Sequence, residues 1–174
     1  MITEVIRNAV MEDIPDVICM HEELYKAEVE AAGVPVEHAE AQISSWKPRE
    51  WRIENWSRGL TTDDSLFFKV VEVDEELVGL FVGVLQPESD MARISRINLH
   101  PKVQGRGIGT RLVTQFHGKV PRERRINLLV LESNSNAIHF YQGLGYTATG
   151  KVEDTEIGGY KTKRIEMERK GVML

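Results

Sequence analysis

Three glycines alternate with other residues near the middle of the sequence, at Gly105, Gly107 and Gly109. They lie in the segment HPKVQGRGIGTRL, residues 100–112, which leads directly into a helical pattern of apolar residues. Glycines at this point let consecutive backbone N–H groups approach an anion, and the positive end of the helix dipole favours its charge. Three cations stand beside the loop: Lys102, Arg106 and Arg111. The segment predicts a loop that binds a phosphate or pyrophosphate, with a sharp connecting turn as the structural alternative.

Two known phosphate-binding loops can be compared with this segment. A Walker loop requires Gly-Lys followed by Ser or Thr, but Thr110 and Arg111 follow Gly109, which excludes that class. The dinucleotide-binding fingerprint fits better, because two of its glycines are present and Glu132 ends the next predicted strand, where a ribose-binding acid is expected. Thr110 nevertheless replaces the third glycine, and five residues separate the strand from the turn. An enzyme that binds NAD(P) or FAD stays as an alternative.

Other residues that could do chemistry give weaker signals. Three tryptophans, Trp46, Trp51 and Trp56, fall in one short segment, where they form either an aromatic wall for a substrate or anchors for a small helix. Arg93 and Arg96 either meet an acidic substrate or lie on an exposed face. The five histidines have no paired ligand spacing such as HExxH, so we expect no catalytic metal.

The elements that position the glycine loop follow from apolar periodicity. Strands are predicted over residues 3–9, 66–73, 77–85, 92–100, 124–133, 146–153 and 161–169, and helices over 13–29, 108–118 and 134–143. Asp13 is expected to cap the first helix. The strand, loop helix and next strand form a right-handed crossover, which makes these strands parallel. We therefore expect an α/β (α+β) fold: a mixed, mostly antiparallel sheet of about seven strands, with helices on both faces and a central parallel pair.

The apolar positions within residues 92–100 change phase. Ile94, Ile97 and Leu99 cannot all face one side of a regular strand, because successive side chains point to opposite faces. A β-bulge between Ser95 and Ile97 would restore the alternation. We therefore expect an irregularity in the strand that precedes the glycine loop.

Size, charge and cysteine content limit the class of protein. A chain of 174 residues with 41% hydrophobic residues is long enough for one buried core, and no linker divides it, so we expect a single domain over residues 1–174. The net charge of −5 argues against nucleic acid as a partner. The lone Cys19 cannot form an internal disulfide, and no apolar run approaches the roughly 18 residues of a membrane span. We expect no membrane partner and a cytoplasmic location.

Two segments together resemble the GCN5-related N-acetyltransferase (GNAT) family. They are INLHPKVQGRGIGTRLV and, after an intervening strand, SNSNAIHFYQGLGY, and the similarity is strongest over residues 92–146. The family's acetyl-CoA loop has the form Gln or Arg, two residues, Gly, one residue, Gly or Ala, which Gln104, Gly107 and Gly109 match. Residues 33–65 match only loosely. The resemblance implies the family's fold and the transfer of an acetyl group from acetyl-CoA directly to an amine.

The resemblance also implies roles for individual residues. Pyrophosphate binding falls to the backbone of six consecutive residues, Gln104, Gly105, Arg106, Gly107, Ile108 and Gly109. The main chains of Ile97 and Leu99 would pair with the pantetheine arm like an added strand. Asn134 matches an asparagine that contacts this arm, and it can cap the following helix as well. Tyr141 matches the tyrosine that protonates the departing thiolate, with a packing role as the alternative.

Acetyl transfer by direct attack needs few catalytic groups, because a thioester is already activated. The resemblance implies a backbone N–H at Leu99 or His100 that stabilises the oxyanion, and a base that removes the proton of the amine. Many members of the family carry an acidic residue at the position where Arg93 stands here. The candidates for the base are therefore ordered water and three carboxylates, Glu72, Glu88 and Glu132.

The resemblance leaves the partners of the chain broadly defined. The acceptor is the amine of a small molecule, an amino acid derivative or a protein. A second copy of the chain is a candidate partner, because homodimers are common in the family. A catalytically silent module that binds coenzyme A is the remaining alternative to an enzyme.

Overall fold

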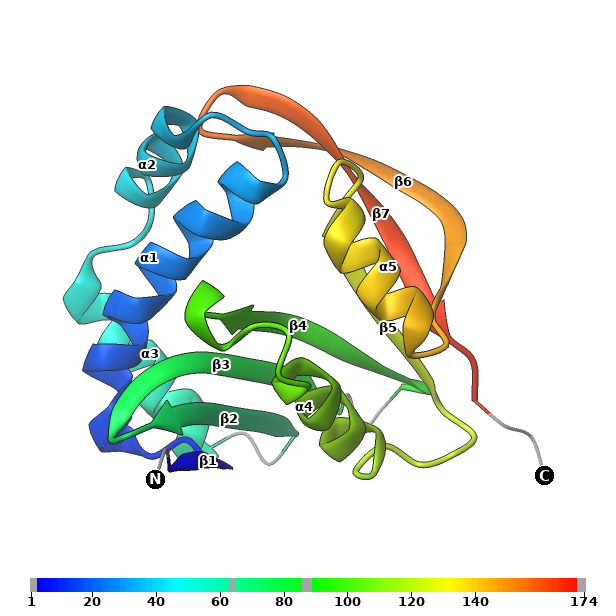
Figure 1. The fold of residues 1–174 in the computed structure, drawn as a ribbon, viewed down its shortest axis with the longest axis horizontal. Helices are drawn as coiled ribbons and strands as arrows, with labels where there is room; N and C mark the ends of the chain where they lie inside the picture. The colour runs from blue at the N-terminus through cyan, green and yellow to red at the C-terminus, as the bar shows by residue number, and fades with distance from the viewer. Residues whose placement is uncertain (1–2, 63–64, 86–88, 172–174) are drawn as a thin grey trace.

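Seven strands form one sheet in the computed structural model, which describes residues 3–62, 65–85 and 89–171 (Figure 1). The strands are β1 (Glu4–Asn8), β2 (Leu66–Val73), β3 (Glu76–Val84), β4 (Met91–Leu99), β5 (Arg125–Leu131), β6 (Thr147–Ile157) and β7 (Tyr160–Arg169). Their order in the sheet is β1-β2-β3-β4-β5-β7-β6. Among these strands β4 and β5 are parallel, and the other neighbours are antiparallel. The expected mixed sheet with a central parallel pair is confirmed.

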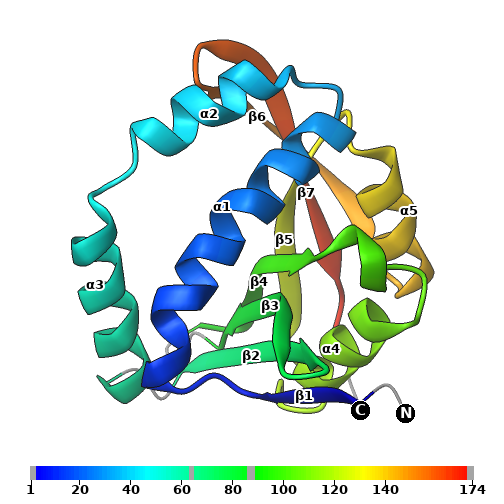
Figure 2. The same ribbon diagram turned by 60° about the vertical axis from the view of Figure 1, so that its left-hand side comes forward.

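Helices cover both faces of this sheet, as Figures 1 and 2 show. The α-helices are α1 (Ile14–Ala31), α2 (Val36–Ser44), α3 (Arg49–Thr62), α4 (Ile108–His117) and α5 (Ser135–Gly143), and two 3₁₀ turns are η1 (Met11–Asp13) and η2 (Pro101–Val103). Helices α2 and α3 were not among the helices predicted from the sequence. Within the described ranges, no helix is both long enough and apolar enough to cross a membrane.

The side chains of β2 show how the two faces are filled. Phe68 and Val70 pack with α1, whereas Phe67 and Val71 pack in the cluster that contains α4 and α5. This division follows from the alternation of side chains along a strand. Helix α3 lies on the α1 side, where Trp56 meets the ring of Phe68 edge-on at 6.0 Å. The sheet therefore has α1 and α3 on one face, and α4 and α5 on the other.

Helix α1 begins without the expected capping bond from Asp13. The carboxylate of Asp13 instead accepts hydrogen bonds from Arg7 at 2.7 and 2.8 Å, and from the N–H of Val10 at 2.8 Å. Arg7 lowers the pKa of Asp13 through this contact. The capping prediction was wrong because an arginine of β1, six residues earlier, competes for the same carboxylate. Helix α1 also continues to Ala31, two residues beyond its predicted end.

Strand β4 carries the expected bulge. Val82 of β3 is opposite Arg96, but its neighbour Gly83 is opposite Ile94, so Ser95 has no partner in the register. The bulge resets the alternation of side chains. Arg93, Arg96 and Asn98 are opposite Val84, Val82 and Leu80, on the side of the sheet covered by α1. The apolar Ile94, Ile97 and Leu99 face the cluster of α4 and α5.

Strands β4 and β5 are paired at one end only. Their register includes Met91 with Arg125, Ala92 with Ile126 and Arg93 with Asn127, and it stops there although both strands continue. Parallel strands that separate in this way leave backbone groups unpaired on their facing edges. The opening between β4 and β5 lies at their carboxyl ends, where α4 and α5 begin, and this is the usual place for a ligand in such a sheet.

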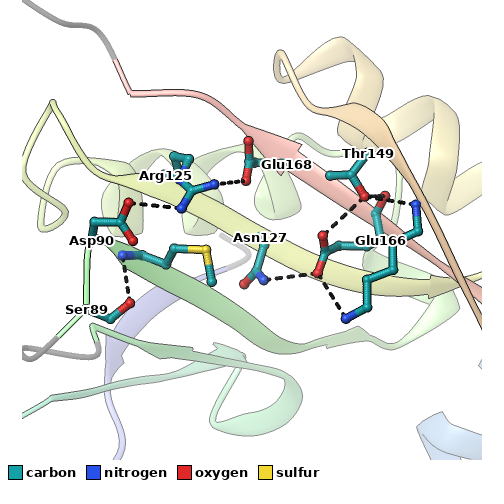
Figure 3. A network of polar contacts seen from close by, with 9 residues as sticks. Ser89, Asp90, Arg125, Asn127, Thr149, Glu166 and Glu168 are labelled. Carbon is teal, nitrogen blue, oxygen red and sulfur yellow. Dashed lines mark hydrogen bonds and ion pairs between the residues drawn. The ribbon is translucent and has the colours of Figure 1, made fainter.

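A polar network spans the paired ends of these strands (Figure 3). Arg125 of β5 forms ion pairs with Asp90 at 2.9 Å and with Glu168 of β7 at 3.3 Å. Asn127 donates to Glu166 of β7 at 3.4 Å. These contacts join the start of β4 to β5 and β7, so the strands stay together at this end and separate at the other.

Candidate active site

The opening between β4 and β5 contains a cleft of about 600 Å³, which we call the glycine-loop cleft. It is bounded by α1, the end of β4, the loop before α4 and the start of α5. Eight of the nine residues predicted to bind the cofactor line it: Ile97, Leu99, Gln104, Gly105, Gly107, Ile108, Gly109 and Asn134. Arg106 is the exception, because its side chain is exposed outside this lining.

The edge of β4 offers backbone groups to this cleft. The N–H of His100 donates to the carbonyl of Val78 on β3 at 2.8 Å. Backbone groups alternate in direction along a strand, so those of Leu99 and Ile97 point away from β3 and toward the opening. His100 is therefore unsuitable as the oxyanion donor, and Leu99 is the better of the two predicted positions.

The three loop glycines are needed for different reasons. Gly105 and Gly107 have φ angles of +73° and +75°, which a residue with a side chain rarely adopts. A Cβ atom on either one would meet no protein atom within 4 Å, because both face open space. Gly109 has an ordinary backbone, but a Cβ there would lie 3.2 Å from the ring of Phe140. The first two glycines shape the loop, and the third lets α4 approach α5.

The cations beside the loop are not equally available. Lys102 forms an ion pair with Glu76 at 2.6 Å, and Arg111 forms one with Glu4 of β1. Arg106 makes no ion pair with any described residue, and its side chain is exposed. The side-chain amide of Gln104 donates to the carbonyl of Leu99 at 2.9 Å, which ties the loop to the end of β4. Of the three cations, Arg106 is thus the one without an ion-pair partner among the described residues.

A second cavity of about 350 Å³ lies where β4 and β5 separate, and it is lined by residues of α1 on one face of the sheet and of α5 on the other. We call it the arginine pocket, because three arginines line it: Arg93, Arg96 and Arg164. Six residues line both the arginine pocket and the glycine-loop cleft: Glu28, Ile97, Asn98, Asn134, Ala137 and Phe140. The two spaces therefore meet where β4 separates from β5.

Glu28 of α1 lies at this junction, and it was not among the site residues predicted from the sequence. Asn98 of β4 donates a hydrogen bond of 2.6 Å to its carboxylate. Surrounding protein raises the pKa of Glu28 above its ordinary value, although Asn98, Arg96 and Arg164 oppose the rise. A signal was present in the sequence, since Glu28 follows Leu24 by four residues, at the spacing of the apolar stripe of α1. A carboxylate on the inner face of a helix is a candidate for function.

Tyr141 of α5 lies in the wall of the arginine pocket, with 5% of its surface exposed. Its ring contacts those of Phe140 and Tyr146, with centroids 5.0 and 5.5 Å away. Burial raises its pKa, and the negative charge of Glu28 raises it further. The hydroxyl group is therefore protonated at neutral pH, and it lies within electrostatic range of Glu28.

Asn134 precedes α5 and lines both spaces. Its side-chain oxygen accepts a hydrogen bond of 3.0 Å from the N–H of Ala137, so the predicted helix cap is confirmed. The cap uses one end of the amide group and leaves the NH₂ group available to a ligand. Both predicted roles are thus compatible with one conformation.

The three tryptophans have three different surroundings. Trp46 lines the arginine pocket and stacks on His21 at 5.2 Å, with Tyr25 edge-on at 5.0 Å. Trp56 anchors α3 to the sheet, as described above, and Trp51 is 49% exposed. Burial lowers the pKa of His21 to about 3, so this ring is neutral at pH 7. The helix anchor is confirmed for Trp56, whereas Trp46 lines a pocket and its role as an aromatic wall for a substrate stays a prediction.

Two of the carboxylates proposed as bases from the sequence, Glu72 and Glu132, do not line the junction. Glu72 forms an ion pair with Arg7 at 3.0 Å, on the far side of β2. Glu132 is exposed and lines neither space, and Glu88 lies outside the described residues. Among described residues, no group of three His, Cys, Asp or Glu side chains could hold a metal ion.

The sequence model of the acetyltransferase (GNAT) family matches residues 22–146 of the chain. The chain therefore belongs to the GNAT acetyltransferase family, and it is an acetyl-CoA-dependent N-acetyltransferase. The match includes Glu28, the glycine loop and Tyr141. It favours the acetyltransferase over the dinucleotide-binding alternative.

Relatives of known description agree with this assignment. The chain is 33% identical over 106 residues to an acetyltransferase of Pectobacterium atrosepticum, covering 60% of this chain and 71% of that protein. It is 34% identical over 82 residues to the L-2,4-diaminobutyric acid acetyltransferase of Nocardia farcinica, covering 40% of this chain and 42% of that protein.

Solved structures share the fold at lower identity. The PaiA N-acetyltransferase of Thermoplasma acidophilum, in complex with coenzyme A, superposes with a TM-score of 0.72 and 24% identity, covering 97% of this chain and 99% of that one. A chimera of the Vibrio cholerae spermidine N-acetyltransferase SpeG and hSSAT has a TM-score of 0.71 and 20% identity, covering 95% of this chain and 94% of that one. The predicted fold of the family is confirmed.

Proposed function

We propose that acetyl-CoA binds in the glycine-loop cleft, that the amine enters the arginine pocket, and that transfer takes place at their junction. The observation that carries this proposal is the meeting of Glu28 and Asn98 where the two spaces join, with Tyr141 in the adjoining wall of the arginine pocket and within electrostatic range of Glu28. One face of the junction offers free backbone groups, and the other offers a carboxylate and a buried hydroxyl group. These are the parts that a direct transfer between a thioester and an amine requires.

The glycine-loop cleft fits the shape and charge of the donor. Gly105 and Gly107 line the cleft with open space beside their Cα atoms, just before the N-terminus of α4, where backbone N–H groups favour an anion such as pyrophosphate. The backbone of Ile97 and the N–H of Leu99 can hydrogen-bond an extended chain with amide groups, such as pantetheine, while the carbonyl of Leu99 already accepts from Gln104. Bound there, acetyl-CoA supplies an activated acetyl group as a thioester.

Glu28 is the proposed base. An alkylamine with a pKa of about 10.4 is almost fully protonated at pH 7 and cannot attack a carbonyl in that form. A carboxylate whose pKa is raised accepts a proton more readily than an ordinary one. Asn98 holds one carboxylate oxygen at 2.6 Å, which leaves the other for the amine. The ammonium group first gives one proton to solvent, and Glu28 takes the second proton as the neutral amine forms the new C–N bond.

Tyr141 is the proposed acid, and its neighbour Glu28 controls its strength. The negative charge of Glu28 raises the pKa of Tyr141, so the hydroxyl group is a weak acid while Glu28 is ionised. Once Glu28 has taken the amine proton, its charge is neutralised and Tyr141 becomes a better donor. The C–S bond then breaks, the thiolate receives the proton of Tyr141, and Leu99 N–H stabilises charge on the carbonyl oxygen. Return of one proton from Glu28 to Tyr141, directly or through water, restores the enzyme.

Two measurements test the proposed function. Acetyl-CoA should raise the melting temperature, since a ligand that binds only the native state must stabilise it. Thiol release from acetyl-CoA should depend on an added amine, with a panel that includes diaminobutyric acid and spermidine, the compounds named for the Nocardia and Vibrio proteins. Stabilisation by acetyl-CoA without thiol release for any amine, free or protein-bound, would indicate the catalytically silent module instead.

Three further expectations stay as proposals. We propose one domain over residues 1–174, a homodimer and a cytoplasmic location. The single sheet and the family match support the first of these. Light scattering after size-exclusion chromatography measures the mass of the assembly, and a mass of 19.8 kDa would contradict the homodimer.

A further inference from the structure

The described lining of the arginine pocket contains more basic than acidic residues. Arg93, Arg96 and Arg164 line it, and Glu28 is the one carboxylate in the described lining. His21, which also lines the pocket, is neutral because burial lowers its pKa to about 3. If Glu28 serves the amine, three guanidinium groups face the acceptor with no acidic residue of the lining left to balance them.

The fold brings these arginines to one side of the sheet. The bulge at Ser95 puts Arg93 and Arg96 on the face covered by α1, as described above. Arg164 of β7 is next to Ile165, whose side chain packs on the opposite face, so Arg164 also faces α1. Two strands that are not neighbours in the sheet, β4 and β7, thus supply cations to the same pocket.

These arginines also differ from others in the chain by having no carboxylate partner. Within the described residues, none of the three forms an ion pair, whereas Arg7, Arg52, Arg58, Arg111 and Arg125 all do. The acidic side chains on the strands around Arg164 have other partners. Glu153 pairs with Lys151 at 2.9 Å, although it is also within electrostatic range of Arg93 and Arg164. Glu166 pairs with Lys151 at 3.8 Å and accepts a hydrogen bond from Asn127 (Figure 3).

Unbalanced cations inside a pocket are unfavourable unless an anion joins them. Arg96 keeps contact with solvent, but the surrounding protein still lowers its pKa, and the charge of Glu28 opposes the change. The planar fork of a guanidinium group matches the two oxygens of a carboxylate, which gives Arg its preference for that group. An anion from the ligand would therefore complete the pocket.

We propose that the acceptor is a free amino acid, whose amine meets Glu28 while its carboxylate binds among Arg93, Arg96 and Arg164. This inference rests on the proposed function of the junction. Arg96 and Arg164 both act on the charge of Glu28, so the amine site and the cations are near enough for one small molecule to span them. A polyamine would instead bring further positive charges next to three arginines. Tyr25 and Trp46 form the apolar wall along which a side chain can lie.

The test compares each amino acid with the amine that remains when its carboxylate is removed. Lysine is set beside cadaverine, ornithine beside putrescine, and the other amino acids beside their own amines. We expect kcat/KM for the best amino acid to exceed that of its matched amine by at least ~10-fold, the scale of one charge-assisted pair. Equal use of both members, or turnover of amines alone, overturns the proposal.

Two results separate this inference from the proposed function. Thiol release with spermidine, a protein amine or phosphoethanolamine, but with no amino acid, overturns the amino acid proposal and leaves the acetyltransferase intact. No thiol release with any amine overturns the proposed function itself. Phosphoethanolamine is included because arginines also bind phosphate. A higher kcat/KM for phosphoethanolamine than for ethanolamine would show that the pocket recognises a phosphate group instead of a carboxylate.

Substitutions of the arginines test whether they bind the carboxylate of the acceptor. Arg164→Met and Arg96→Met should raise KM for the amino acid at least ~10-fold and leave KM for the matched amine unchanged or lower, because only the carboxylate contact is lost. Arg122→Met is the control, since Arg122 is exposed and lines neither space. Acetyl-CoA binding, measured by calorimetry, confirms that each variant is folded. Equal loss for both members of a pair contradicts the proposal.

Discussion

The glycine-loop cleft and the arginine pocket meet at one junction but are built in different ways. The groups of the cleft proposed to hold the donor are mostly backbone, from the loop at Gly105 and Gly107, the edge of β4 and the start of α4, although side chains of α1 and α5 also line it. The arginine pocket is bounded by side chains from α1, β4, β7, α5 and the segment between α2 and α3. Backbone groups are the same in every protein, whereas side chains can change one at a time.

This difference indicates which half of the site binds the donor common to the family and which half selects the acceptor. A donor common to a whole family can be held by N–H groups and a helix terminus, which need only the correct backbone angles. An acceptor that differs between relatives must be recognised by charge and shape, which side chains provide. Substitutions in the two regions should therefore have different kinetic signatures.

The largest effect is expected at the junction itself, from Glu28→Gln. The amide has nearly the same shape but cannot take a proton, so kcat/KM should fall by about 10²–10³-fold, the usual scale for loss of a general base. The rate of the normal enzyme should fall as the pH drops below the raised pKa of Glu28, and the variant should lack this limb.

Glu23→Gln provides the matched control for Glu28. Glu23 lies on the same helix but lines neither space, whereas Glu28 lines both. Its substitution should leave the pH profile unchanged. If Glu28→Gln keeps the acid limb of the profile, another group or water is the base.

The next largest effect is expected from Tyr141→Phe. The ring and its contacts with Phe140 and Tyr146 remain, but the proton donor is lost, so single-turnover transfer should slow by roughly 10²-fold near pH 7. The defect should shrink toward pH 9, because a thiolate with a pKa of about 8.5 can leave without a proton. Acetyl-CoA affinity should change little.

Tyr146→Phe is the control for the loss of a tyrosine hydroxyl group. Tyr146 bonds to His117 at 2.9 Å rather than to the junction, so its substitution should lower stability by about 1 kcal/mol without slowing the chemical step. Equal single-turnover rates for Tyr141→Phe and the normal enzyme would make Tyr141 a packing residue.

A smaller effect, confined to the donor, is expected from Gly107→Val. Valine is unfavourable at a φ of +75°, and its side chain would fill the open space in front of the loop, so Kd for acetyl-CoA should rise by at least ~10-fold. Gly159→Val is matched to it, with a φ of +89° and open space, but it lies in the turn between β6 and β7. Both should lose about 1–2 kcal/mol of stability, and Gly159→Val should keep full affinity in calorimetry.

The smallest effect is expected from Arg106→Ala. Its guanidinium group is exposed and lies outside the lining of the cleft, so its attraction for a phosphate is screened by salt. Kd for acetyl-CoA should rise by about 2-fold at low ionic strength and by less at ~0.5 M salt. A loss as large as that of Gly107→Val would mean that Arg106 makes a specific contact, and that the cleft also depends on a side chain.

The sequence by itself determined the local features of the donor half. The alternating glycines, the bulge at Ser95 and the crossover between β4 and β5 were all predicted, because each depends on backbone angles or periodicity within a short segment. The cap at Asn134 belongs to this group as well. The expected cap at Asp13 failed because Arg7 of a different element competes for it.

Only the tertiary structure decided the acceptor half. Glu28 and Asn98 are 70 residues apart in the chain, and their hydrogen bond exists because α1 packs against β4. Arg164 joins Arg93 and Arg96 because β7 lies beside β5, an order of strands that no local pattern specifies. Backbone conformation is set by neighbours in the chain, whereas a pocket of side chains is set by which elements pack together. The physical range of the interactions therefore explains why the donor loop could be read from the sequence and the acceptor pocket could not.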